Sequence, residues 1–235
     1  RNRVEHHVEQ RLHRIAGLVG VERCVSPFAR GVQVREVAER LFTAQIEQQL
    51  ECFVERFVGA GVGATIGKIL GYENCMKSGI GSASIKVEDF VVGAIVAVNA
   101  FGDVYDVETN RIIAGALNPQ KNGFADPINM FKGALDTIPP SQNTTIGVIA
   151  TNAELTKSEI TKAAQMAHDG YSRAIRPVHT MYDGDAIFGL ATGGVKADVT
   201  YVGILGAEVT ARAIVNGVKA AKSLGNLPSM SDLNF

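Results

Sequence analysis

The sequence predicts an α/β fold in which strands and helices pack in layers, and three observations lead to this class. Strand patterns and helix patterns mix from Val58 to about Gly225, with no internal repeat. The stretch "TTIGVIA", which starts at Thr144, is β-branched and typical of a strand. Directly after it, Thr156 and Glu159 form the capping-box pattern of a helix start. A chain of 235 residues can hold one such domain with a real core, or at most two small ones.

The first part of the chain differs in amino-acid composition from the rest. Residues 1–57 are rich in Arg, Glu, Gln and Val, and apolar spacing within 34–53 predicts a helix with one apolar face. From Val58 the chain changes to glycine and small residues. We therefore divide it into an atypical, mostly helical N-terminal segment, 1–57, a core, 58–225, and a tail, 226–235, that is expected to be loose.

The core begins with loop and strand patterns. Glycine-rich residues 58–71 predict a loop that runs into a short helical piece. Residues 83–87 and 90–102 are predicted strands, and the second is so uniformly apolar that both faces should be buried. A hairpin is expected within 103–116, turning at residues 108–110.

The second half of the core alternates helices and strands. A short helix is predicted for 128–136, and Pro139–Pro140 ends it before the strand at Thr144. The capped helix covers 155–175 and turns one face inward. A strand within 183–192 and a glycine-containing helix over 202–224 complete the core. The inward face of the capped helix is predicted to consist of Ile160, Ala163, Ala164, Ala167 and Tyr171.

Composition excludes several classes of function. A net charge of −1 gives no electrostatic reason to bind nucleic acid or an anionic membrane. Three cysteines without a CxxC pair argue against disulfides and thiolate metal sites and favour a reducing, cytoplasmic location. The apolar run 90–102 is too short to span a bilayer, and no signal-peptide pattern is present. His168, expected on a helix surface, and His179, expected in a loop or core, have no ligand-type neighbours, so no metal or cofactor is predicted.

The glycine-rich loop raises the alternative of a nucleotide site. Residues 59–64 satisfy GxGxxA, but a charged helical pattern precedes them and no acidic residue follows at the ribose-binding distance. The P-loop pattern also fails, because Val62 replaces its first glycine and Ile69 follows Lys68. A tight turn or close backbone approach is the better explanation of these glycines.

Five polar residues have both a structural and a catalytic interpretation. Lys68 lies among small and apolar residues, and Asn99 lies in the most apolar strand, so each needs a polar partner. Asp183 and Asp185 flank a glycine, which an ordinary turn would explain. Thr144 is a normal strand residue, and Asn143-Thr144-Thr145 also fits the glycosylation acceptor pattern of a secreted chain. Together, however, they supply a hydroxyl, a cation, an amide donor and two carboxylates, which are the parts of an acyl-transfer site.

Acyl transfer by Thr144 becomes chemically simple if the chain is cut before it. The new α-amine would then lie beside the residue's own hydroxyl and could act as its general base. The approach "TIPPSQN" is rich in breakers, as expected for an accessible scissile bond. No Ser-His-Asp set or GxSxG motif offers a competing nucleophile.

Long stretches of the core resemble one known family. "VGAGVGATIGKILG", "VVGAIVAVNAFGDVYDVETNRIIAGA", "NTTIGVIATNAELTK" and "AQMAHDGYSRAIRPVHTMYDGDAIFGLATG" are similar to the DmpA-type aminopeptidases of peptidase family S58. The resemblance runs from about Val58 to Ser223. It implies an αββα sandwich like that of N-terminal-nucleophile hydrolases, self-cleavage into two subunits and assembly into homo-oligomers of processed units.

The same resemblance implies a role for each candidate residue. Cleavage between Asn143 and Thr144 would expose Thr144 as the nucleophile. Lys68 matches a catalytic lysine and Asn99 an oxyanion-binding asparagine, while Asp183 and Asp185 match acidic positions that assist the nucleophile. Thr144 with the Asp-Gly-Asp turn is most similar to the nylon-oligomer endohydrolase branch.

Three functions therefore stay open. The first is a self-processing hydrolase of peptides, small amides or esters. The second is an inactive remnant of that fold, since residues 1–57 show no counterpart of the family's glycine-rich pocket segment. The third is a nucleotide-binding module, which depends only on the glycine-rich loop.

Overall fold

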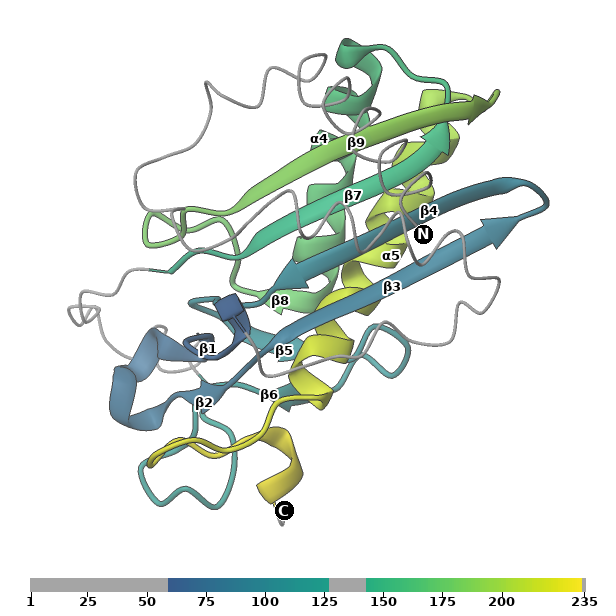
Figure 1. Ribbon diagram of the computed structural model, residues 1–235. Helices are drawn as coiled ribbons and strands as arrows, with labels where there is room; N and C mark the ends of the chain where they lie inside the picture. The colour runs from purple at the N-terminus through teal and green to yellow at the C-terminus, as the bar shows by residue number, and fades with distance from the viewer. Residues whose placement is uncertain (1–58, 127–142, 234–235) are drawn as a thin grey trace, which may run out of the picture. The chain divides into compact units, whose positions relative to one another are not determined.

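The computed structural model describes residues 59–126 and 143–233 (Figure 1). The helices predicted within 34–53 and for 128–136 lie outside these residues. The α-helices of the described part are α4 (Lys157–Ala174) and α5 (Val199–Lys219). Its strands are β1 (Thr65–Ile66), β2 (Met76–Lys77), β3 (Ile80–Val87), β4 (Phe90–Ala97), β5 (Asp103–Tyr105), β6 (Ile112–Ala114), β7 (Ile146–Ala153), β8 (Ile175–Arg176) and β9 (Ala186–Val195).

The main sheet has the strand order β3-β4-β7-β9. Strands β3, β4 and β7 pair antiparallel, whereas β7 and β9 pair in parallel. A parallel pair needs a crossover, and α4 provides it. Helices α4 and α5 pack against each other and against the same face of the sheet (Figure 1). The predicted α/β class is confirmed, and the described residues contain a helical layer and a sheet layer.

Helix α4 begins where the sequence predicts. The Thr156 hydroxyl accepts from the Glu159 amide at 3.3 Å, and the Glu159 carboxylate accepts from the Thr156 amide at 2.7 Å. This capping box satisfies two amides that the helix itself leaves unpaired. The predicted inward face is confirmed: Ala163, Ala164, Ala167 and Tyr171 are buried, and Ile160 is partly buried against the core.

Helix α5 packs closely on the sheet because both surfaces are built from small residues. A Cβ atom added at Gly81 of β3 would lie 2.2 Å from the Ala213 carbonyl oxygen and 2.2 Å from the Gly217 nitrogen of α5. No side chain fits such a distance, so the glycine lets the two backbones touch. The glycines of this helix therefore serve packing and do not break it.

A smaller sheet has the strand order β6-β5-β8. Strands β5 and β6 form the predicted hairpin, and Asn110 in its turn takes a left-handed conformation with φ of 56°. The two-residue strand β8, which follows α4 directly, was not predicted from the sequence. It pairs with β5 and so ties the end of α4 to the hairpin.

The predicted loose tail makes specific contacts as far as Leu233. The Lys77 amide donates to the Pro228 carbonyl at 2.8 Å, and Ser229 is buried at the start of a short 3-10 turn, Met230–Asp232. Sequence composition does not reveal this docking, because it depends on contacts with distant segments: the bond to β2 and the packing of Met230 and Leu233 against the core. The last two residues lie outside the described part.

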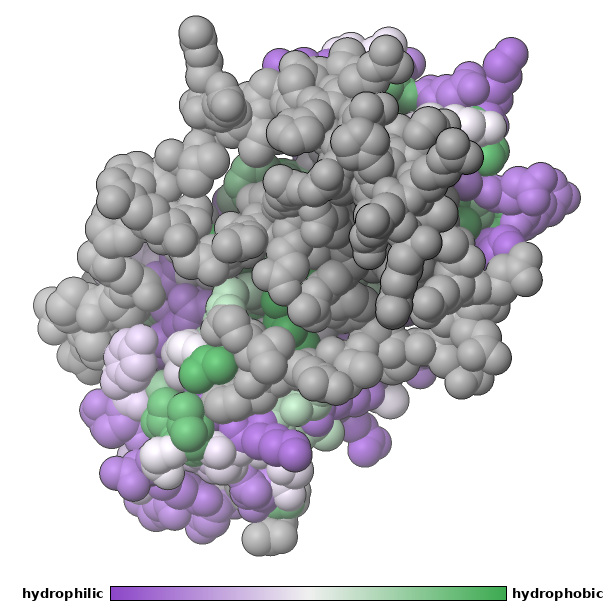
Figure 2. Space-filling view, in the orientation of Figure 1, coloured by the Kyte–Doolittle hydropathy of each residue, from purple (hydrophilic) through white to green (hydrophobic). Residues whose placement is uncertain are grey.

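The surface around β1 and β2 mixes hydrophobic and hydrophilic side chains (Figure 2). Its exposed large apolar residues include Val62 and Tyr72. Scattered apolar side chains of this kind are normal on protein surfaces. Among the described residues, no helix combines the length and apolar character needed to cross a membrane.

We expect Gly81→Ala to lower the free energy of unfolding by about 1–3 kcal/mol, because the added methyl would separate β3 from α5. Gly63→Ala is the control, since a Cβ atom there has no neighbour within 4 Å. It should change stability by no more than about 0.5 kcal/mol. Urea unfolding of the two variants measures both values, and equal stabilities would contradict the close packing of β3 on α5.

Candidate active site

The structure brings Asn99 and Thr144 together at one edge of the main sheet. The last pair of the β4–β7 ladder is Ala97 with Ile146, and the same register continued by two residues places Asn99 opposite Thr144. The Thr144 amide donates to the Asn99 carbonyl at 3.0 Å. Two residues that are 45 positions apart in the sequence are therefore held side by side by backbone pairing.

Lys68 meets the side chain of Asn99. Its Nζ atom donates to Asn99 Oδ1 at 2.7 Å, and the Thr65 amide donates to the same oxygen at 3.2 Å. An ammonium group has no acceptor, so the amide atom facing it must be the oxygen. Asn99 Nδ2 is then left without a bonded acceptor in the described part of the chain and is available as a donor.

The Lys68 ammonium is desolvated. Its side chain is completely buried, and its one hydrogen bond within the described residues is the bond to Asn99. Burial lowers the pKa of Lys68 from 10.5 to about 8, although the Cys75 thiol and the Asp183 carboxylate act in the opposite direction. Such a lowered pKa is typical of a lysine that is desolvated without a carboxylate bonded to it, and functional lysines belong to this class.

The Thr144 hydroxyl contacts the peptide bond that precedes it. Oγ1 donates to the Asn143 carbonyl oxygen at 2.6 Å, and the Gly184 amide donates to the same oxygen at 2.8 Å. Thr145 is completely buried, and its hydroxyl has no partner among the described residues. The Thr144 hydroxyl therefore contacts the Asn143–Thr144 peptide bond, while the Thr145 hydroxyl lies in the interior.

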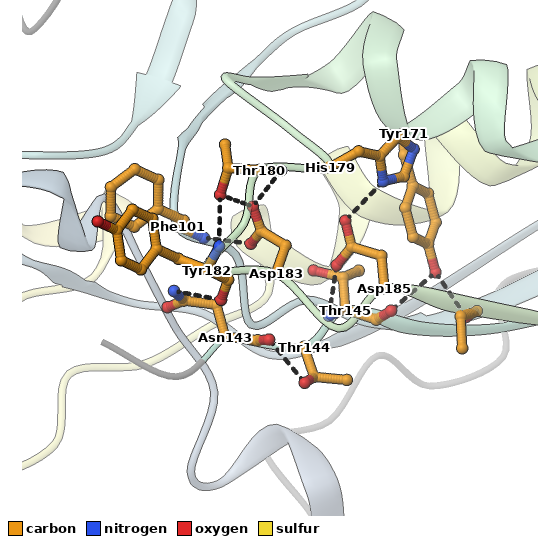
Figure 3. A network of polar contacts seen from close by, with 11 residues as sticks. Phe101, Asn143, Thr144, Thr145, Tyr171, His179, Thr180, Tyr182, Asp183 and Asp185 are labelled. Carbon is orange, nitrogen blue, oxygen red and sulfur yellow. Dashed lines mark hydrogen bonds and ion pairs between the residues drawn. The ribbon is translucent and has the colours of Figure 1, made fainter. Parts of the chain in front are cut away.

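The two candidate carboxylates lie on either side of Gly184 and are both fully engaged (Figure 3). Asp183 accepts from the Thr180 hydroxyl at 2.6 Å and amide at 3.0 Å, and from the Phe101 amide at 3.3 Å. Asp185 accepts from the Thr145 amide at 2.9 Å and lies 2.9 Å from His179 Nδ1. Neither carboxylate forms a hydrogen bond with Thr144, so their contact with the candidate nucleophile is indirect.

Burial raises the pKa of the Asp185 carboxyl, and the Thr145 amide and His179 oppose this effect. The Asp185 side chain is 3% exposed, whereas that of His179 is 39% exposed. The imidazole thus covers a buried carboxylate from the solvent side. The ring centre of His168, on α4, lies 5.0 Å from that of His179, and burial lowers the pKa of His168.

Sequence reasoning did not identify four members of this site: Tyr171, His179, Thr180 and Gly184. Tyr171 was assigned to a helix face, where its hydroxyl in fact lies 3.3 Å from the carbonyls of Thr145 and Ala186. His179 lies in the loop before β9, and its nearness to the Asp-Gly-Asp turn was the one available indication. Gly184 contributes a backbone amide, which no residue pattern reveals.

The glycine-rich loop forms a 3-10 turn, Gly59–Gly61, that leads into β1. In a dinucleotide-binding motif such a loop opens a helix, whereas here it leads into strand β1. Within residues 59–126 and 143–233, no cluster of three or more His, Cys, Asp or Glu side chains could hold a metal ion.

Comparisons with known proteins agree on one family. The sequence model described as "Peptidase family S58" matches residues 21–228, a range that begins inside the segment set apart above as atypical. An uncharacterized aminopeptidase of Mycobacterium leprae is 39% identical over 180 residues, which are 66% of this chain and 48% of that protein. A 6-aminohexanoate-oligomer endohydrolase of Kocuria is 27% identical over 159 residues, which are 60% of this chain and 44% of that protein.

Among solved structures, the L-aminopeptidase D-Ala-esterase/amidase from Ochrobactrum anthropi, described as a variant of the Ntn hydrolase fold, matches with a TM-score of 0.47. It is 20% identical, and the match covers 72% of this chain and 45% of that one. The chain thus spans about half the length of the proteins that it matches.

The pKa of Lys68 makes stability depend on pH. Between pH about 8 and 10.5 the unfolded chain keeps a proton on Lys68 that the folded chain releases, so raising the pH stabilises the fold in this window. We expect Lys68→Met to remove about 2–3 kcal/mol of this pH-dependent gain. Urea unfolding across the window gives the difference, and Lys86→Met, at an exposed lysine of β3, is the control. If the free energies of unfolding of Lys68→Met and the native chain differ by the same amount at every pH, the Lys68 ammonium is hydrated in the folded protein.

Proposed function

Because the chain belongs to peptidase family S58, we propose that it is a self-processing amide hydrolase with Thr144 as its nucleophile. The observation that carries the proposal is the 2.6 Å contact between Thr144 Oγ1 and the carbonyl oxygen of Asn143, beside Asn99 and Lys68. Nucleophile, amide donor and cation belong to three separate segments that meet at one edge of the sheet. Acyl transfer needs this combination of groups.

Self-cleavage would begin at the Asn143–Thr144 bond. In the proposed step Thr144 Oγ1 bonds to the Asn143 carbonyl carbon, the carbon–nitrogen bond breaks, and the departing nitrogen gains the proton that the hydroxyl loses. Water then hydrolyses the resulting ester, which leaves a carboxylate on Asn143 and returns a proton to Oγ1. The products are chains of 143 and 92 residues, which together make the 235 of the precursor.

Turnover would use the amine that cleavage creates. The nitrogen of Thr144 lies 3.0 Å from the Asn99 carbonyl oxygen, so an acceptor is already in place for the new amine. An unperturbed α-amine has a pKa of about 7.7–8.0, and the nearby Lys68 charge would lower it and favour the free base. The amine would take the hydroxyl proton, Asn99 Nδ2 would stabilise the oxyanion, and water would release the acyl group.

The relatives favour amide bonds as the substrate. One is named an aminopeptidase and another an oligomer endohydrolase, and both names describe hydrolysis of an amide. We extend this class to the present chain as peptides or small amides, without a metal or cofactor. Asp183 and Asp185 act in this proposal as positioning residues, since their hydrogen bonds go to Thr180, Phe101, Thr145 and His179.

We expect freshly purified protein to convert from 25.0 kDa into two fragments, the smaller of which begins Thr-Thr-Ile-Gly-Val. Thr144→Ser keeps an oxygen nucleophile and should still cleave, whereas Thr144→Ala removes it and should stay whole. Intact-mass spectrometry and Edman sequencing give both results. A native chain that stays at its full mass after long incubation would favour an inactive remnant of the fold.

Thr145→Val is the matched control for Thr144→Ala. The Thr145 hydroxyl is buried and has no partner among the described residues, so valine fills the same space without losing a bond. This variant should cleave at the native rate. Cleavage of Thr144→Ala together with failure of Thr145→Val would move the nucleophile by one residue.

We expect Asn99→Ala to lower kcat of the processed protein by roughly 10²–10³, the usual cost of losing one oxyanion donor. Asn216→Ala is the control, because this asparagine is also partly buried but lies on α5, where its Nδ2 donates to the Ser82 carbonyl at 2.9 Å. Its kcat should be unchanged, and urea unfolding measures the stability of both variants. An Asn99→Ala protein with native kcat would make Asn99 a structural amide.

A further inference from the structure

We propose that the backbone amide of Gly184 is the oxyanion donor for self-cleavage, and that this donor is separate from the Asn99 amide that serves substrates. The inference rests on the proposed function and assigns a group to its first step. It starts from the hydrogen bond that the Gly184 amide donates to the Asn143 carbonyl oxygen at 2.8 Å. That oxygen is the atom on which negative charge would develop when Thr144 attacks.

The donor lies on the acyl side of the scissile bond, where Asn99 does not act. The contact of Asn99 with this peptide is its carbonyl, which accepts from the nitrogen of Thr144 at 3.0 Å. Its side-chain oxygen is bonded to Lys68, and no hydrogen bond joins Asn99 Nδ2 to the Asn143 oxygen. Within residues 59–126 and 143–233, the bond to that oxygen from outside the Asn143–Thr144 segment comes from the Gly184 amide.

The residues on either side of Gly184 hold it in position. Asp185 is bonded to the Thr145 amide, one residue beyond the nucleophile, and to His179. Asp183 is bonded to Thr180 and to the Phe101 amide, two residues beyond Asn99. Figure 3 shows that these contacts surround the turn from two sides. A donor fixed before the reaction stabilises a developing charge without reorganising.

Space at this position also favours glycine. A Cβ atom at residue 184 would lie 3.0 Å from Thr144 Oγ1 and 3.7 Å from the Asn143 oxygen. A methyl group there would press on the hydroxyl that has to move toward the carbonyl carbon. The hydrogen on Cα thus leaves the path of attack open while the neighbouring nitrogen donates.

The amide stabilises one defined intermediate. When Oγ1 bonds to the Asn143 carbon, the carbonyl electrons move onto the oxygen and form an oxyanion in a five-membered ring. Collapse of this ring restores the carbonyl, breaks the carbon–nitrogen bond and leaves the ester. The Gly184 hydrogen bond should strengthen as the charge forms and weaken again as the ester forms.

The test replaces the Gly184 amide by an ester, through incorporation of glycolic acid at this position of the full-length chain. This change removes the N–H donor and keeps the size of the residue. We expect conversion of the precursor to slow about 100-fold, at the lower end for an oxyanion donor, because Gly184 is exposed and water can partly replace it. Intact-mass spectrometry over time measures the rate.

Lactic acid at Ala186 is the matched control. The Ala186 amide donates to the Thr145 carbonyl at 3.1 Å, so this ester removes a bond of the same kind one residue beyond the nucleophile. It should change the rate by no more than about threefold, because no charge develops on that carbonyl. Equal slowing by both esters would assign the effect to general docking of the strand and overturn the proposal.

Gly184→Ala tests the space requirement with the amide retained, and we expect it to accumulate precursor. Suppose that the unmodified chain cleaves and that Gly184→Ala and the Gly184 ester both cleave at the native rate. That result would overturn the assignment of Gly184 and leave the proposed function standing. An unmodified chain that stays whole would overturn the proposed function and this inference with it.

Discussion

The hydrogen bond from the Thr144 amide to the Asn99 carbonyl continues the pairing of β4 with β7 beyond the ends of both strands. A slip of one residue would turn the Thr144 side chain to the other face of the sheet, so the site depends on this register. Hydrogen bonds at the opposite end of the β4–β7 pair fix this register. There Asn152 accepts from the Val91 amide at 2.8 Å and donates to the Asp89 carbonyl at 2.7 Å, while the Thr151 hydroxyl donates to the Val91 carbonyl at 2.8 Å.

The charged groups of the site lower the stability of the folded chain, and the rest of the fold has to offset this electrostatic cost. Burial disfavours the charged form of Lys68 and raises the pKa of Asp185, so both groups reduce stability near neutral pH. Close packing of small residues between α5 and β3 is one contribution that offsets this cost. A stable core beside a costly polar cluster is the arrangement expected of a functional site.

Sequence patterns predicted those parts of the structure that depend on local chemistry. The capping box placed the start of α4, and alternation placed the strand after Thr144, because both signals act within a few residues. Lys68 and Asn99 were identified because a buried polar group needs a partner, and each is the other's partner. The Gly184 amide, strand β8 and the docking of Pro228 could not be predicted in this way. They depend on backbone atoms, which are the same in every residue, and on contacts between distant segments.

The proposed mechanism asks one hydroxyl to perform two reactions with different helpers. In the precursor the nitrogen of Thr144 is an amide and cannot act as a base, whereas in the processed chain it is the base. The oxyanion also changes place, because the new Asn143 carboxylate has to move away from Thr144, while Lys68 and Asn99 of the same chain stay, and a substrate carbonyl takes up a new position. A single donor optimised for the first oxygen would be poorly placed for the second. The structure offers two separate donors: the Gly184 amide, which is bonded to the Asn143 oxygen, and the side-chain amide of Asn99, whose oxygen is bonded to Lys68. Cleavage can therefore end the role of the Gly184 amide without disturbing the side-chain amide of Asn99.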